Sequence, residues 1–242
     1  MSAGTAALRY AVRVSIPPKR WWTLALPCAG AVVLALLSLT SDAPAKDVFP
    51  HVADVGLFAL LIPIGCLVIG DAVLGAEIRA GTFHFTWLTP VPIRTIVLAR
   101  WFGGWLIALA TLVPAVVLAA FAGDHSASAW PLAVATAAGS AAYLALFVLI
   151  GCVTKRAAVW SLAVVFLVER LLGAALSGIA QLSPMWVSRS VYAGLCDDAS
   201  FLLRDGVPSG WAGVVRLALL TVVFLALSIW RLRHLRLAGA AD

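Results

Sequence analysis

Long apolar runs recur along almost the whole of this chain, and they constrain its fold more than any other feature. There are six, and each is about 20 residues long, enough to cross a hydrocarbon core of roughly 30 Å. They cover Trp22–Thr40, Ala53–Leu74, Thr95–Phe121, Trp130–Val153, Ala157–Ala180 and Ala212–Arg231. The runs do not alternate between polar and apolar residues as the strands of a membrane barrel do, so they predict helices. With 63% hydrophobic and 12% charged residues, the chain is predicted to be an all-α polytopic membrane protein.

The distribution of Lys and Arg predicts which side of the membrane each loop faces. If the N-terminus is cytoplasmic, 12 of the 17 Lys and Arg residues fall in inner segments, the bias expected for cytoplasmic loops. We therefore expect a multi-pass protein of the plasma (inner) membrane with both termini in the cytoplasm. The net charge of +6 indicates contact with anionic membrane lipids, because no basic stripe suggests binding to nucleic acid.

The first 20 residues are predicted to form a helix that lies in the inner membrane interface. Leu8 and Val12 fall on one side of this helix and Arg9 and Arg13 on the other, which is typical of an interfacial helix. A solvated basic tail is the alternative. Pro17-Pro18 and the absence of a cleavage site argue against a signal peptide.

Several chemistries lack their sequence signatures. The four cysteines form no CxxC pair and the four histidines show no HExxH spacing, so we expect neither an extracellular disulfide nor a metal site. There is no GxxxxGK[ST] loop and no GxSxG elbow. The chain is therefore not expected to be an enzyme or to bind a cofactor, and any ATP-driven activity needs a separate polypeptide.

Residues 181–210 form a long outer segment that is only partly polar. Large apolar side chains such as Met185, Trp186 and Phe201 occur throughout it, between breaks at Pro184, Gly194 and Asp205-Gly206. Two short helices that enter the outer leaflet, a re-entrant hairpin between spans five and six, explain these side chains better than a solvated loop.

The segment between the second and third runs, residues 75–94, is charged and broken by Gly and Pro. Apolar side chains available for packing, such as Phe83 and Trp87, stand beside Glu77 and Arg79, which can form ion pairs. Such a helix at the inner surface could transmit a push from a soluble partner into spans two and three. An ordinary amphipathic connector resting on lipid headgroups is the alternative.

With this segment, the chain resembles the type-2 ABC-transporter permeases, the transmembrane subunits of ABC exporters. The resemblance covers the layout of six spans, the interfacial helix, the coupling segment and the re-entrant hairpin. Its motif, a Glu followed by Gly-Thr, Leu, Pro and a basic residue, is matched in order by Glu77, Arg79, Gly81, Thr82, Leu88, Pro90, Val91, Arg94, Leu98 and Arg100.

The resemblance implies a single transmembrane permease domain over residues 1–242 and a coupling helix that docks on an ATPase. The residues expected to couple are Glu77, Ile78, Arg79, Gly81, Thr82, Phe83, Trp87, Leu88, Pro90 and Arg94. The implied partners are two copies of a cytosolic ABC ATPase, which would hold ATP and magnesium, and a second permease subunit, the same chain or a similar one. The resemblance implies export, and an apolar path with few fixed charges favours an amphipathic or lipid-like substrate or drug.

A second candidate site lies deep in the fifth run, where Glu169 and Arg170 are adjacent. An unpaired charge at mid-membrane costs at least about 2.5–3.5 kcal/mol on insertion scales. Neighbouring helical residues point about 100° apart, so the two cannot fully satisfy each other and at least one is expected to reach another element. Asp71 is a candidate partner for Arg170. These residues mark either the translocation path or subunit interface, or a buried structural ion pair.

Two other functions compatible with this layout stay open. An ion-driven secondary transporter would need more mid-membrane acids and an inverted repeat, neither of which is evident in the sequence. A non-transporting membrane scaffold or sensor subunit would use the same docking segment without moving a substrate.

Overall fold

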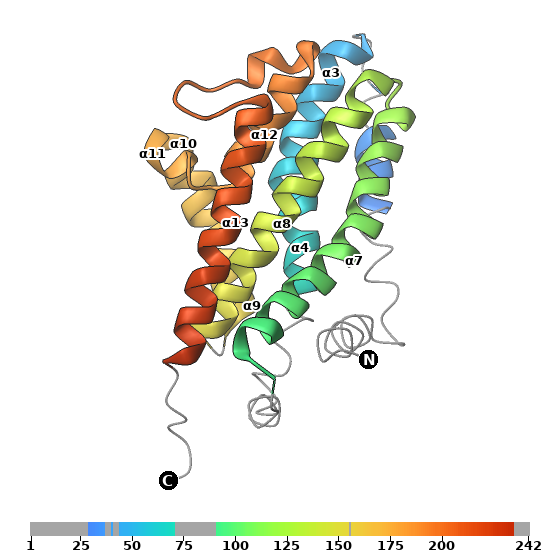
Figure 1. Ribbon diagram of the computed structural model, residues 1–242. Helices are drawn as coiled ribbons and strands as arrows, with labels where there is room; N and C mark the ends of the chain where they lie inside the picture. Colours follow the sequence, from blue (N-terminus) through green and yellow to red (C-terminus); the bar gives the residue numbers. More distant parts are fainter. Residues whose placement is uncertain (1–28, 37–39, 41–43, 71–90, 155, 235–242) are drawn as a thin grey trace.

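The computed structural model describes residues 29–36, 40, 44–70, 91–154 and 156–234 (Figure 1). The described residues are helical and contain no strand. Five helical runs are long and apolar enough to cross a membrane: Asp47–Gly70, Ile93–Ala122, Ser126–Val153, Ala157–Ala175 and Gly210–Arg233. They confirm a multi-pass helical membrane protein. Of the first predicted span, residues 29–36 are helical and most of the rest lies outside the described residues, as do residues 1–20.

The second predicted span starts earlier than the sequence suggested. It consists of α3 (Ala45–Val52), the π-helix η1 (Ala53–Leu61) and α4 (Ile62–Gly70) in unbroken succession. Asp47 lies in the first turn of α3, where a carboxylate stabilises the helix dipole, and Phe49 is buried in the core. Pro50 lies inside α3, so the residues directly before Ala53 belong to the helical run.

The third and fourth spans agree with the predictions within two residues. They are α7 (Ile93–Ala122) and α8 (Ala129–Val153), joined through the short 3₁₀ helix η3 (Ser126–Ser128). The sixth predicted span is α13 (Gly210–Arg233), two residues longer at each end than expected.

The fifth span, Ala157–Ala175, ends five residues earlier than predicted. It comprises α9 (Ala157–Ala163), the π-helix η4 (Val164–Leu172) and α10 (Gly173–Ala175). Leu176 has extended backbone angles, with φ −120° and ψ 114°, and ends the run there. The short helix α11 (Ser177–Ala180) follows as a separate element, because an extended residue interrupts the hydrogen-bond ladder although the sequence stays apolar.

Residues 181–210 contain two short helices, while their entry into the outer leaflet stays a prediction. They are α12 (Pro184–Leu195) and the 3₁₀ helix η5 (Asp197–Leu202). Ser183 caps α12 by accepting a hydrogen bond from the Trp186 N–H, and Pro184 occupies the first helical position, which it favours. α12 packs against α8 and α13, so this segment is part of the bundle.

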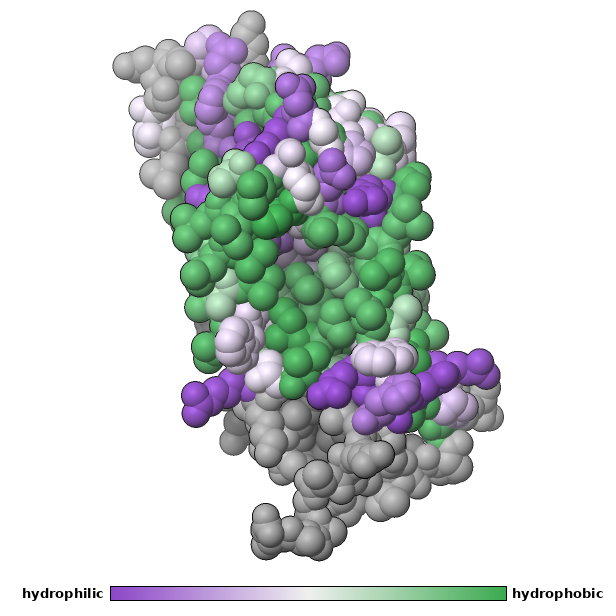
Figure 2. All heavy atoms as spheres, turned by 90° about the vertical axis from the view of Figure 1, so that its left-hand side faces the viewer, coloured by the Kyte–Doolittle hydropathy of each residue, from purple (hydrophilic) through white to green (hydrophobic). Residues whose placement is uncertain are grey.

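Helix α8 is the centre of the bundle and packs against α4, α7, α12 and α13. Glycines allow close approach at two of the neighbouring contacts: a Cβ on Gly65 would lie 2.7 Å from the Leu112 side chain, and one on Gly70 would lie 3.1 Å from that of Phe147. α4 ends, α7 begins, and α13 ends at the same end of the bundle (Figure 1). Figure 2 shows an apolar belt with polar zones above and below it, as expected for a protein surrounded by lipid.

Candidate functional site: a buried carboxylate in the bundle

Glu169 is the most deeply buried acidic side chain in the described part of the chain, with 2% of its surface exposed. The Tyr143 hydroxyl donates to its Oε2 at 2.6 Å, and the Ser183 hydroxyl donates to its Oε1 at 2.7 Å. The backbone N–H of Met185 points to the same Oε1 at a longer 3.5 Å. The carboxyl group therefore joins α8, η4 and the start of α12 at one point.

Glu169 is bound through its backbone as well as through its side chain. It lies in the π-helix η4, whose wider turn is rare in proteins and is frequently found at functional sites. The Trp186 indole N–H donates to the Glu169 carbonyl oxygen at 2.8 Å, and so α12 binds both the side chain and the backbone of this residue. A Cβ on Gly173 would lie 2.5 Å from Nε1 of the same indole, so this glycine makes room for the tryptophan.

Arg170, the other half of the predicted charged pair, is half-buried and lies on a different side of η4. It interacts electrostatically with Asp54 of η1. Asp71, the partner that the sequence suggested, lies outside the described residues. The adjacent charges are thus directed to different neighbours, Glu169 to hydroxyl donors and Arg170 toward the second span.

A second charged group lies close by and was not predicted. Asp54 Oδ1 and Arg189 Nε are 3.0 Å apart, each side chain less than one-fifth exposed, although the two atoms lack hydrogen-bond geometry. The Arg189 guanidinium also lies over the Trp186 ring, 4.9 Å from its centroid, and the Arg204 guanidinium lies 4.7 Å from that centroid. Arg204 donates to the Gly173 and Ala174 carbonyls at 2.6 and 2.8 Å, which satisfies the end of the fifth span.

A further polar cluster joins the α7–α8 connection to α12 and η5. His125 contacts the Ser128 hydroxyl at 2.6 Å and Asp198 at 3.0 Å, and Ser128 contacts the Tyr192 hydroxyl at 2.7 Å. Burial raises the pKa of the Tyr192 hydroxyl, which keeps it neutral and able to donate. Ser128 is completely buried, so no substrate can reach its hydroxyl. The cluster holds the α7–α8 connection against α12 and η5.

Of the predicted coupling residues, only Arg94 lies in the part of the chain that the structure describes. Nine of them lie outside it: Glu77, Ile78, Arg79, Gly81, Thr82, Phe83, Trp87, Leu88 and Pro90. Arg94 is described and is the second residue of α7, where its side chain is exposed at the end of the bundle. The proposed docking surface is therefore represented here by this one residue.

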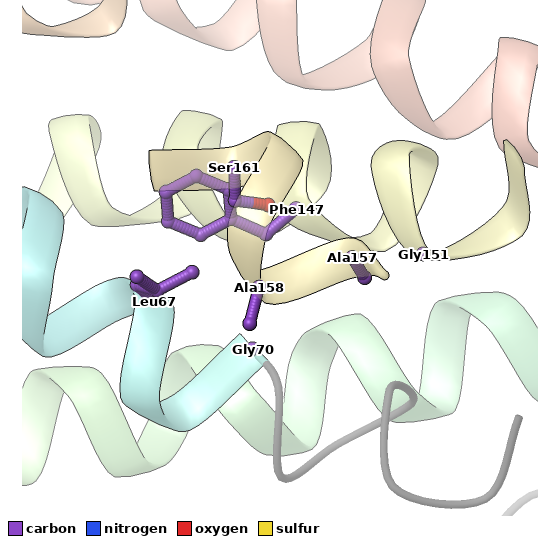
Figure 3. Close-up of a pocket in the computed structure, with 7 residues that line it drawn as sticks. All are labelled: Leu67, Gly70, Phe147, Gly151, Ala157, Ala158 and Ser161. Carbon is purple, nitrogen blue, oxygen red and sulfur yellow. The ribbon is translucent and has the colours of Figure 1, made fainter. Parts of the chain in front are cut away.

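Among the hollows on the bundle, two are lined by residues that the structure describes. A small one between α4, α8 and α9 has a volume of about 10 Å³ and is lined by Leu67, Phe147 and Ser161 among others (Figure 3). It has room for a single water molecule. A larger groove of about 480 Å³ lies along α7, α8 and α13, with an almost entirely apolar lining.

Sequence reasoning identified Glu169 but missed its partners and the Asp54–Arg189 pair. Asp54 at the start of an apolar run and Arg189 in a partly apolar segment were signals, because each needs a partner once buried. Within the described residues, no group of three or more His, Cys, Asp or Glu side chains could hold a metal ion. No family model and no curated protein matches the chain.

Proposed function

We propose that the chain is the permease subunit of an ATP-driven exporter, working with two copies of a separate cytosolic ATPase. ATP and magnesium bind to that partner, and a second permease subunit, identical or similar, completes the path. Residues 71–90 and the exposed Arg94 form the surface that receives the ATPase. The cargo is an amphipathic or lipid-like molecule.

One observation supports this proposal: the helices on either side of the charged segment, which links the second and third spans, meet it at the same end of the bundle (Figure 1). α4 ends at Gly70 and α7 begins at Ile93 on the same end of the bundle. That end also carries, in the described residues, Arg94, Arg100, Arg156, Arg231 and Arg233. The acidic residues Asp47, Asp54, Asp124, Asp197, Asp198 and Asp205 lie at or near the opposite end, beside Lys46, Arg189, Arg204 and Arg216. Cytoplasmic loops are rich in Arg, and this supports a cytosolic location for the charged segment and for both termini.

The close packing of α4 against α8 supports a path along which a movement of the charged segment is transmitted to η4. Gly70 at the end of α4 lies against Phe147 of α8, and Tyr143 lies one turn before Phe147 on that helix, with its ring stacked on the Phe147 ring at 5.6 Å. Tyr143 in turn holds Glu169. A displacement at the α4–α7 end therefore has a continuous packed path to η4 and α12.

The test is to purify the chain from its native membrane in mild detergent, identify the proteins that accompany it, and measure ATP hydrolysis. We expect a P-loop ATPase whose association and activity are lost when Glu77 and Gly81 are replaced. Asp205→Asn, an exposed change at the other end of the bundle, is the matched control and should leave both unchanged.

The rival functions give different results in the same experiment. A chain that purifies without an ATPase, and whose flux follows an ion gradient, is a secondary transporter. An ATPase that binds without substrate-dependent flux indicates a scaffold or sensor subunit. Either result would overturn the proposal.

A further inference from the structure

The groove along α7, α8 and α13 is an unusual surface for a helical bundle because small residues create it. Ala137 and Ala141 of α8 and Ala218 of α13 line its floor and side, where larger side chains would fill it. Trp101 and Trp105 of α7 form the facing wall. Its volume of about 480 Å³ lies within the roughly 300–1,000 Å³ typical of small-molecule sites.

The polar atoms that line the groove are already bonded within the protein. The Trp101 indole N–H donates to the Ala141 carbonyl and that of Trp105 to the Ala137 carbonyl, each at 3.0 Å. The two rings stack with centroids 5.7 Å apart and 7° between their planes. The Thr221 hydroxyl donates to the Leu217 carbonyl at 2.8 Å. The groove thus offers its occupant hydrocarbon and aromatic faces, which suit an acyl chain.

The same three helices carry a basic cluster at one end. Ile93 at the start of α7 and Leu232 near the end of α13 pack into one small core with Cys152 of α8, so these helix ends are held together. Arg94 and Arg233 are exposed beside them, and Arg231 is half-buried. Arg231 also acts electrostatically on Cys152, which lies next to the end of α8.

The spacing between this cluster and the groove matches one lipid leaflet. Arg94 precedes Trp101 by seven residues, which corresponds to about 10 Å along a helix that rises 1.5 Å per residue. Arg233 follows Val222 by 11 residues, or about 16 Å by the same rise, and three full turns place it on the same face of α13. Half of a hydrocarbon core is about 15 Å thick, so a lipid with its phosphate at the arginines extends its chain into the groove.

We propose that this face binds one anionic phospholipid from the surrounding leaflet. Arg94 and Arg233 hold the headgroup, and one acyl chain lies in the groove against Trp101 and Trp105. The anionic charge follows from the arginine cluster, since basic sites between membrane helices select anionic headgroups. This site does not include the Glu169 cluster, and Arg94 is the one residue that it shares with the surface proposed to receive the ATPase.

The experiment uses the full chain in phosphatidylcholine vesicles doped with brominated phosphatidylglycerol or brominated phosphatidylcholine. Bromine quenches tryptophan fluorescence on contact, and the variant Trp101→Phe/Trp105→Phe isolates the two groove tryptophans from the 10 in the chain. We expect the brominated anionic lipid to quench them at a much lower mole fraction than the zwitterionic one. Because a basic residue near the surface contributes about 1 kcal/mol, neutralising one arginine should weaken this preference about fivefold.

Three variants distinguish the headgroup from the groove. Arg94→Gln/Arg233→Gln should remove the anionic preference, whereas Arg156→Gln, an exposed arginine on the α8–α9 link at the same end, should leave it unchanged. Ala138→Leu fills the groove and should abolish quenching of Trp101 and Trp105 while both tryptophans stay in place.

Equal quenching by the two lipids would overturn the proposal, and so would undiminished quenching in Ala138→Leu. A second copy of the chain on this face is the other occupant that the groove could take. Disulfide-linked dimers of Ala138→Cys in native membranes, absent from the unmodified chain, would show that occupant and refute the lipid site.

Discussion

Replacing Glu169 should weaken the attachment of α12 to the bundle. The loss in the free energy of unfolding can be worked out from the hydrogen bonds that Glu169 accepts. Glu169→Ala removes the acceptor of two hydroxyls, at 2.6 and 2.7 Å, and leaves both donors buried. Hydrogen bonds to charged groups contribute about 1.5–3 kcal/mol each, whereas side-chain bonds between membrane helices average only about 0.6 kcal/mol. The free energy of unfolding should therefore fall by about 1–6 kcal/mol. We expect the upper half of that range because Tyr143 is completely buried, so its hydroxyl cannot turn to bulk solvent for another acceptor.

Glu169→Gln tests the geometry more finely. The amide keeps the volume and one acceptor oxygen, but its NH₂ group faces one of the hydroxyls, which must turn from donor to acceptor. The loss should be about half of that for Glu169→Ala. Ser140→Ala is the matched control, because Ser140 is also buried on α8 but its hydroxyl bonds locally to the Ala137 carbonyl.

The assay is reversible unfolding in mixed micelles, followed by tryptophan fluorescence, with Trp186 as a reporter beside the site. A double-mutant cycle of Glu169→Gln with Tyr143→Phe should give a coupling of about 1 kcal/mol or more, since the two residues share one bond. If the two changes add to within about 0.5 kcal/mol, as for distant sites, the carboxylate does not hold α8 and this account of the site is wrong.

Three further changes test the packing of α12 and its neighbours. Gly139→Ala should destabilise the chain by about 1–3 kcal/mol, because its Cβ would lie 2.3 Å from the Ser188 hydroxyl; thermal unfolding should show partial rescue by Ser188→Ala. Gly194→Ala should cost more and resist such rescue, because its Cβ would meet the backbone nitrogen of Gly210 at 2.3 Å; equal melting temperatures for the two alanine variants would contradict this. Arg204→Lys should speed hydrogen exchange at the end of the fifth span, since a lysine cannot match the two carbonyl bonds of the guanidinium; unchanged exchange there would refute the capping role.

The membrane helices were the part of the fold most accessible from the sequence. Apolar length alone located α7, α8 and α13 within two residues, because a span must fill the hydrocarbon thickness. The same criterion failed at Leu176, where the backbone becomes extended within an apolar sequence. It also placed the start of the second span at Ala53, whereas the helical run begins at Ala45 in α3.

The candidate site was predictable only in part. Glu169 was identifiable because a carboxyl group in an apolar run is costly. Its partners Tyr143 and Ser183 were not, since they lie 26 and 14 residues away and no periodic pattern links them. Contacts between distant segments depend on how helices pack, which hydrophobicity does not encode.

The uneven charge of the two bundle ends has an electrical consequence. In the described residues one end carries five arginines, and the other has a net charge of −2, from six Asp against Lys46, Arg189, Arg204 and Arg216. Moving a unit charge across a membrane potential takes about 2.3 kcal/mol per 100 mV, so turning the folded bundle over at that potential involves about 16 kcal/mol of electrical work. A membrane potential that is negative on the side of the arginine-rich end therefore favours this orientation of the bundle over the reverse one.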